Sequence, residues 1–137
     1  MKEKEINTWL ASIDGLENGN FTNRPKIKER HFFTIGDGWL DIVKDLVNDL
    51  IKLGWNKEIC QVKEKFGGLR FYANAMTDEM YNRVKVAEEL ASKTCEICGA
   101  TENIGQTTGW IVTICESCFN KSKKENNIWA NRKWEIK

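Results

Sequence analysis

The sequence has a single histidine, His31, among its 137 residues. A small zinc-dependent nuclease needs a histidine beside its metal, and residues 95–137, which hold four of the five cysteines, contain none. The fifth cysteine, Cys60, has no histidine near it in the sequence that could serve as its base. The sequence therefore argues against an enzyme. We expect His31 to be a surface or capping residue and Cys60 to pack within a strand.

Net charge and long hydrophobic runs are also scarce. The chain has 21 basic and 20 acidic residues, a formal net charge of +1, so bulk charge does not indicate a nucleic-acid binder, although a local basic patch could still act as one. No stretch approaches the roughly 18 apolar residues of a membrane helix, and the charged start MKEKEINTWLASIDG lacks the apolar core of a signal peptide. We therefore expect no membrane partner and a cytoplasmic location, where cysteines serve as metal ligands or free thiols rather than as disulfides.

What is present is the composition of an ordinary globular protein, 41% hydrophobic and 30% charged. The six tryptophans are many for this length, and tryptophan either fills cores or anchors interfaces. The clustered cysteines begin only at residue 95. We therefore predict an α+β core over residues 1–94, made of helices and a hairpin, and a metal-binding module over residues 95–137 with a helical, tryptophan-containing tail.

Three stretches of the core have the spacing of apolar residues that predicts an amphipathic helix. They cover residues 5–17, 38–53 and 78–93. Asp37 is predicted to cap the second helix and Gly54 to end it, and Thr77 is predicted to cap the third.

The stretch QVKEKFGGLRFY, residues 61–72, places two glycines between alternating runs. A phosphate-binding loop would lead into a helix, whereas the residues after Gly68 are strand-like. Two glycines between such runs favour a type I′ turn, which needs positive φ at both positions. We therefore predict strands over residues 59–66 and 69–75, joined at Gly67-Gly68, in a small antiparallel sheet packed on two or three helices.

A two-residue turn at the glycines sets Phe66 opposite Leu69, on the core face, and turns Glu64 toward the core as well. A three-residue loop would instead set Glu64 opposite Arg70. A buried carboxylate needs a partner, so Glu64 and Arg70 are the predicted polar pair under either register.

The other face of the hairpin is basic and aromatic, with Lys63, Lys65, Arg70 and Tyr72. This basic face is either a plain solvated sheet face, the reading we favour, or a contact for phosphates and a base. Trp110 and Trp129 are further candidates for contact with a partner or nucleic acid.

The cysteines form the pattern C-x2-C-x16-C-x2-C, and the residues that make it are Cys95, Cys98, Cys115 and Cys118. Zinc prefers four tetrahedral thiolates, and two intervening residues let both sulfurs of a pair face one ion from a tight turn. Gly99 fits the left-handed backbone that such a turn often needs. We therefore predict one structural Zn²⁺, since four cysteines leave no open position for water.

The shape of the metal module has two alternatives. Residues 106–114 are predicted to form a hairpin or strand carrying Trp110, and the chain after Cys118 is predicted to be helical. A turn, a hairpin and a second cysteine pair at a helix start make a treble-clef-like module. A zinc ribbon would instead place both cysteine pairs on hairpins.

The order of these motifs resembles a family of small uncharacterised proteins of bacteria and their phages. The residues that carry the resemblance are Gly36-Asp37-Gly38-Trp39, the QVKEKFGGLRFY block, Cys95-Glu96-Ile97-Cys98-Gly99 and Gly109-Trp110-Ile111 with Thr113 before Cys115. The resemblance spans residues 31–118. It implies a zinc-binding accessory protein of a phage or mobile element and supplies no catalytic residues.

Two functions are consistent with the sequence. The first is a non-enzymatic, zinc-stabilised binding or adaptor protein whose partner is a protein of the bacterial host, including a host defence complex that it would inhibit. The second is a nucleic-acid-binding zinc protein that uses the basic face.

Overall fold

A computed structural model describes residues 2–19, 25–28, 33–125, 129 and 132–137. In these residues the chain has the predicted α+β class. In chain order the elements are α1 (Lys2–Ser12), β1 (Glu17–Asn18), β2 (Phe33–Thr34), the 3₁₀ turn η2 (Asp37–Trp39), α2 (Leu40–Lys52), β3 (Glu58–Lys65), β4 (Gly68–Ala73), α3 (Asp78–Ser92), β5 (Ile104–Thr107), β6 (Thr113–Cys115), α4 (Glu116–Glu125) and β7 (Trp134–Ile136).

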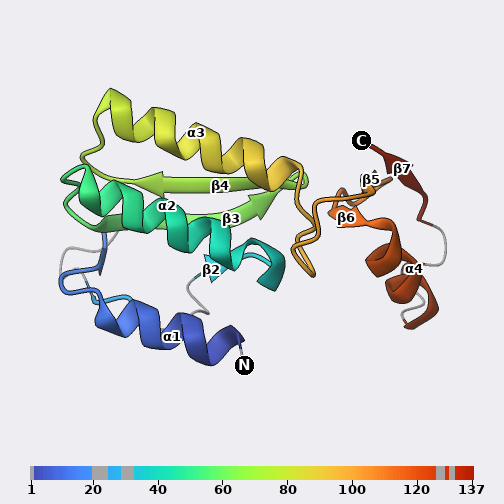
Figure 1. Cartoon of the computed structure of the whole chain (residues 1–137), viewed down its shortest axis with the longest axis horizontal. Coiled ribbons are helices and arrows are strands. Elements are labelled where there is room, and N and C mark those ends of the chain that lie inside the picture. Colours follow the sequence, from blue (N-terminus) through green and yellow to red (C-terminus); the bar gives the residue numbers. More distant parts are fainter. Residues whose placement is uncertain (1, 20–24, 29–32, 126–128, 130–131) are drawn as a thin grey trace.

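The apolar stripe of α2 lies at the centre of the main core. Leu46, Val47 and Leu50 are fully buried there, because the i, i+3, i+4 spacing places them on one face. α2 packs against α3, which in turn packs on β4. On its other side, the indole of Trp9 in α1 donates to the Asn48 side chain of α2 at 3.3 Å. Figure 1 shows the three helices in the order α3, α2, α1.

Two predicted helix ends are confirmed and two are wrong. Thr77 caps α3, accepting from the Met80 amide at 3.3 Å, and Gly54 follows α2 with φ +92°. Asp37 does not cap the second helix, because the chain enters α2 through η2, whose N-cap is Gly36. The first helix ends at Ser12 instead of residue 17, since Gly15 turns the chain with φ +84°.

The predicted hairpin is β3 and β4, and it is the larger part of a four-stranded sheet. Two short strands that the sequence did not reveal, β1 and β2, pair parallel with β3 near its two ends. Strands of two residues carry no alternation to detect. The first sheet is therefore mixed rather than purely antiparallel.

The turn of the hairpin is Phe66-Gly67, one residue earlier than predicted. Both residues have positive φ, +53° and +78°, as a type I′ turn requires. Glu64 lies opposite Leu69, and Arg70 lies opposite Lys63. This register differs from the predicted one by two residues. Because side chains alternate between the faces of a sheet, nearly all of them lie on the face that was predicted for them. Phe66 is the exception, because it moves from the core face to the turn, where 72% of it is exposed.

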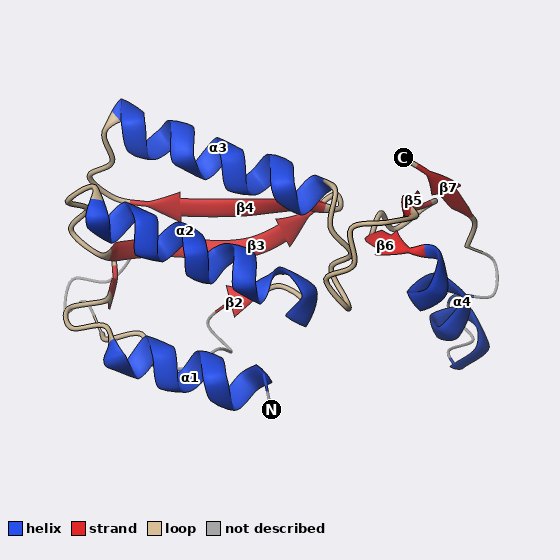
Figure 2. Cartoon of the chain, viewed as in Figure 1, coloured by secondary structure: helices blue, strands red, loops and turns tan. Residues whose placement is uncertain are grey.

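The remaining strands form a second, antiparallel sheet in the order β6-β5-β7. Figure 2 shows a loop from α3 to this sheet, and β6 running directly into α4. β7 was not predicted. The second sheet and α4 surround a smaller apolar cluster that includes Ile104, Ile114 and Phe119. No helix within the described part of the chain is long and apolar enough to cross a bilayer.

Candidate metal centre and adjoining surface

The four predicted cysteine ligands come together in one cluster. The sulfurs of Cys95, Cys98, Cys115 and Cys118 all lie within 4.8 Å of one another. The Sγ atoms of Cys98 and Cys115 are 3.8 Å apart, which is about the edge of a tetrahedron with zinc–sulfur bonds of about 2.3 Å. Four soft donors at this spacing fit a zinc ion, and the cluster is close enough to hold a metal.

A tight turn after α3 supplies the first two sulfurs. The Gly99 amide donates to the Cys95 carbonyl at 2.9 Å, and the Cys95 amide donates to the Ala100 carbonyl at 2.8 Å. Gly99 has φ +81°, a left-handed backbone that favours glycine, as predicted.

A strand end and a helix start supply the other two sulfurs. Cys115 is the last residue of β6, and Cys118 lies in the first turn of α4. The Cys118 amide donates to the Cys115 sulfur at 3.4 Å. Amides at a helix start stabilise a thiolate. Because the second pair opens a helix, the module has the treble-clef-like arrangement and not that of a zinc ribbon.

The thiols differ in their readiness to ionise. Burial opposes ionisation of Cys95, but hydrogen bonds from backbone amides, with those of Cys98 and Cys115 foremost, outweigh it and lower its pKa. Burial raises the pKa of Cys98 and of Cys118, and at Cys118 the neighbouring sulfurs add to the rise. Four sulfurs this close repel one another as thiolates, and a dication at their centre removes that repulsion.

The segment Gly36–Trp39 fastens the first cysteine pair to the main core. The Gly38 amide donates to the Glu96 carbonyl at 2.7 Å, and the Trp39 indole donates to the Thr94 carbonyl at 2.9 Å. The Gly36 amide donates to the Glu96 carboxylate at 3.0 Å. A Cβ at Gly36 would overlap the Glu96 carbonyl, and one at Gly38 the Cys95 carbonyl. Both glycines therefore allow backbone to lie against backbone.

The hairpin turn makes a second connection, to the β5–β6 hairpin. The hydroxyl of Thr113, a fully buried residue, donates to the Gly67 carbonyl at 2.6 Å. A Cβ at Gly67 would lie 2.8 Å from Ile111 Cγ2 and 3.2 Å from the Thr113 hydroxyl. Gly67, the first glycine of the QVKEKFGGLRFY stretch, is thus needed both for its positive φ and for a close approach to the metal module.

The Glu64 side chain accepts a hydrogen bond from the backbone of this turn. The predicted pair between Glu64 and Arg70 does not form. The Glu64 carboxylate accepts from the Gly67 amide at 2.7 Å. Arg70 instead lies opposite Lys63, on the other face of the hairpin. Glu64 therefore stands on the apolar face, opposite the buried Leu69, with its carboxylate satisfied by the amide of the turn.

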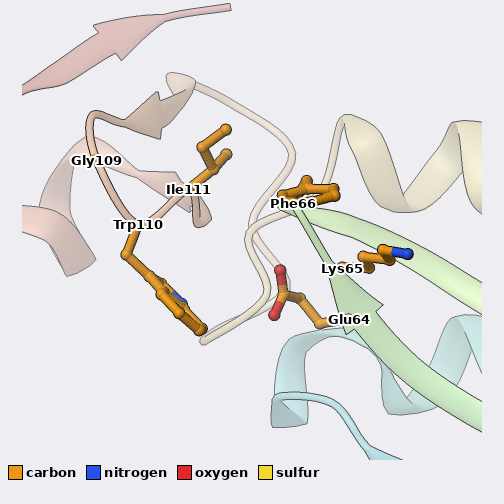
Figure 3. A pocket seen from close by; sticks show the side chains of 6 residues that line it. All are labelled: Glu64, Lys65, Phe66, Gly109, Trp110 and Ile111. Atoms are coloured by element: carbon orange, nitrogen blue, oxygen red, sulfur yellow. The ribbon is translucent and has the colours of Figure 1, made fainter.

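Beside this turn lies a small hollow, of about 230 Å³, that we call the notch. Its walls come from both halves of the chain, and the residues that line it are Glu64, Lys65, Phe66, Gly109, Trp110 and Ile111. Trp110 is 69% exposed at its rim. Figure 3 shows the Glu64 carboxylate pointing toward Trp110 and the Lys65 side chain pointing away from it. Phe66, Ile111 and Glu64 were not predicted as parts of one surface, since the docking of the β3–β4 turn against the β5–β6 hairpin brings them together.

The other predicted contact residues lie apart from the notch or at its edge. Lys63, Lys65, Arg70 and Tyr72 share the outer face of the hairpin, with Tyr72 and Lys65 exposed. Trp129 packs edge-on against Phe119, with ring centroids 6.2 Å apart, and Arg132 lies over its ring. Trp129 is therefore half-buried in the module. His31 lies outside the described residues.

Cys60 lies in β3, as predicted. Its thiol donates to the Asn74 side chain at 3.1 Å, and burial raises its pKa, with a smaller contribution from Glu58. A raised pKa keeps the thiol protonated and poorly nucleophilic.

Comparisons of the chain with protein-family models, with curated proteins and with solved structures found no match. The resemblance to phage and bacterial zinc proteins stays a prediction.

Proposed function

We propose that the chain is a non-enzymatic, zinc-stabilised binding protein whose partner is another protein. One observation carries the proposal: Phe66 and Trp110, 72% and 69% exposed, flank one hollow. Large exposed aromatic side chains around a hollow are typical of interface anchors. The buried bond from Thr113 to Gly67 holds the two halves of this surface together.

The proposed role of zinc is to fix the half of the surface that carries Trp110. Four cysteine ligands complete a tetrahedral sphere, so no position is open for a water or a substrate. The ion would hold Cys115 at the end of β6, and thereby the loop from Gly109 to Ile111 that precedes it. This supports a structural ion and a binding function.

The resemblance to phage and bacterial proteins points to the source of the partner. We propose a protein of the bacterial host, in its cytoplasm, such as a component of a defence complex that the bound chain would inhibit. An accessory protein of this kind acts by covering a surface of its target, which requires an exposed anchor and no catalytic group.

Nucleic-acid binding is the second candidate, and the basic face favours it. Lys63 and Arg70 lie directly opposite each other, beside the exposed Tyr72. Two cations and one aromatic ring on a sheet face could contact a phosphate and a base.

The experiment is capture of partners from host lysate by the zinc-loaded, tagged chain, followed by binding assays with each purified partner. We expect a protein that binds the parent chain and loses most of its affinity for Phe66→Ser and Trp110→Ala. Tyr81→Ala, at an exposed aromatic residue near the start of α3, is the matched control and should bind normally. Equal binding by all variants contradicts the proposal. Recovery of DNA or RNA whose affinity drops steeply with salt supports the second candidate instead.

A further inference from the structure

The notch has one charged group directed into it, the carboxylate of Glu64. Figure 3 shows this carboxylate pointing toward Trp110. Lys65, the other charged residue of the lining, turns its ammonium group toward the Phe66 ring, at 5.7 Å from the centroid. The charge that a ligand would meet between Glu64 and Trp110 is therefore negative, although the basic face lies on the same hairpin.

Glu64 is held in place and still has capacity to accept. Its Oε2 accepts from the Gly67 amide at 2.7 Å, which fixes the direction of the carboxylate. Among the described residues, no lysine or arginine forms an ion pair with it. A carboxylate has about four lone-pair sites, so Oε1 and part of Oε2 remain available to a donor that enters the notch.

The rest of the lining is apolar and partly aromatic. The Trp110 ring stands at one side of the carboxylate, and Ile111 and Phe66 close the other end. A hollow of about 230 Å³ is smaller than the roughly 300–1,000 Å³ of small-molecule sites. It suits a single side chain of a partner better than a free metabolite.

We propose that the notch receives an arginine side chain of the partner protein. The guanidinium stacks on the Trp110 ring and donates to Glu64, and its aliphatic stem contacts Ile111 and Phe66. Arginine suits this site better than lysine, because its plane stacks on an aromatic ring and it is more weakly hydrated. A phosphate is disfavoured, because the carboxylate repels it. This inference rests on the proposed function, since it names what the same surface recognises.

The test uses the zinc-loaded chain and the peptide acetyl-Ala-Arg-Leu-amide. Its matched control is the same peptide with citrulline, which has the shape of arginine without the charge. Binding is followed by ¹H–¹⁵N NMR at the Trp110 indole and the Gly67 amide. We expect the arginine peptide to shift both signals with saturation at millimolar concentration, and the citrulline peptide to shift them much less.

The matched protein variant is Glu64→Gln. A glutamine oxygen can still accept from the Gly67 amide, so the turn is retained while the charge is lost. We expect the arginine peptide to bind this variant about fivefold more weakly, and Trp110→Ala to lose about as much. Tyr81→Ala, which lies outside the notch, should bind the peptide as tightly as the parent chain. If the arginine peptide leaves both signals unmoved, or if Glu64→Gln binds it as tightly as the parent chain, the inference is wrong.

The outcomes also separate this inference from the proposed function. A protein partner that is lost with Trp110→Ala but bound fully by Glu64→Gln supports the proposed function and overturns the arginine site. A partner that tolerates both variants overturns both. If a single-stranded oligonucleotide shifts the Trp110 and Gly67 signals and the peptide does not, the notch binds a base and the proposal fails.

Discussion

Glycines 36, 38 and 67 decide how the two halves of the molecule meet. Gly36 and Gly38 have ordinary negative φ, yet a Cβ at either would overlap backbone of residues 95–96. Both glycines are needed because the backbone lies too close to residues 95–96 to leave room for a side chain. A sequence alone does not distinguish a glycine in this role from one that allows a turn. Gly67 has a positive φ and also lies too close to Ile111 to leave room for a Cβ. Three positions without side chains thus carry much of the fit between the metal module and the core.

Gly38→Ala should be strongly destabilising. The added methyl would overlap the Cys95 carbonyl and lie 2.6 Å from the Gly99 amide nitrogen, and backbone on both sides cannot yield cheaply. We expect a loss of about 3 kcal/mol or more in the free energy of unfolding, measured by urea denaturation with zinc present. Gly68→Ala is the control, because its nearest atom is 3.5 Å away, and it should change stability by less than about 1 kcal/mol. Equal costs at both positions would refute the close-approach explanation.

Thr113→Val tests the buried bond between the halves. Valine keeps the shape of threonine but leaves the Gly67 carbonyl and the Gln106 side-chain amide without the hydroxyl they now contact at 2.6 and 3.2 Å. We expect a loss of about 1–3 kcal/mol, measured by the same denaturation. Thr101→Val, at an exposed position, should cost less than about 0.5 kcal/mol. A neutral Thr113→Val would show that the hydroxyl contributes nothing to docking.

The helices were predicted from the sequence more completely than the strands. The stripe of α2 and the Thr77 cap follow from spacing and one residue type. β1, β2 and β7 could not be found, because their pairing is made by partners remote in sequence. The turn register was also wrong. Gly67 lies in the turn under the predicted register and under the observed one, Phe66-Gly67, so the glycine pair alone does not fix the register.

The cap of α3 gives a prediction at the level of this element. Thr77 accepts from the Met80 amide at 3.3 Å, and α3 joins the sheet to the metal module. Thr77→Ala should lower the free energy of unfolding by about 1 kcal/mol. Thr77→Ser retains the hydroxyl and should restore most of that loss. Both are measured by thermal and urea unfolding, and an alanine variant as stable as the serine variant would contradict the capping role.

One part of the candidate site could be predicted from local sequence, and another part depends on contacts between segments that are remote in the sequence. The four cysteines are predictable because their spacing alone dictates two turns that face one ion. The notch is not, because Glu64 and Trp110 are brought together only by the docking of two hairpins. The predicted Glu64–Arg70 pair failed for a different reason, because the register of the hairpin places the two side chains on opposite faces of the sheet.

The described part of the chain has two apolar clusters of very different size. The main cluster spans α1 to α3 and the first sheet. The buried members of the other are Cys95, Ile104, Ile114, Cys115 and Phe119. Two of these five are candidate metal ligands, so only three buried side chains of the small cluster are independent of the metal site. A core this small needs a further constraint to stay folded.

Removal of zinc should therefore unfold the small cluster and spare the large one. A bound structural zinc contributes on the order of 10 kcal/mol to such modules. We expect one zinc per chain by elemental analysis. After chelation, hydrogen exchange should become fast in β5, β6 and α4 while α2 remains protected. Cys115→Ser should behave like the chelated protein, and Cys60→Ser, which changes a thiol outside the cluster, like the parent. If exchange in α4 stays slow without metal, the docking bonds from Gly38 and Thr113 alone hold the module, and the surface around Trp110 would form without zinc.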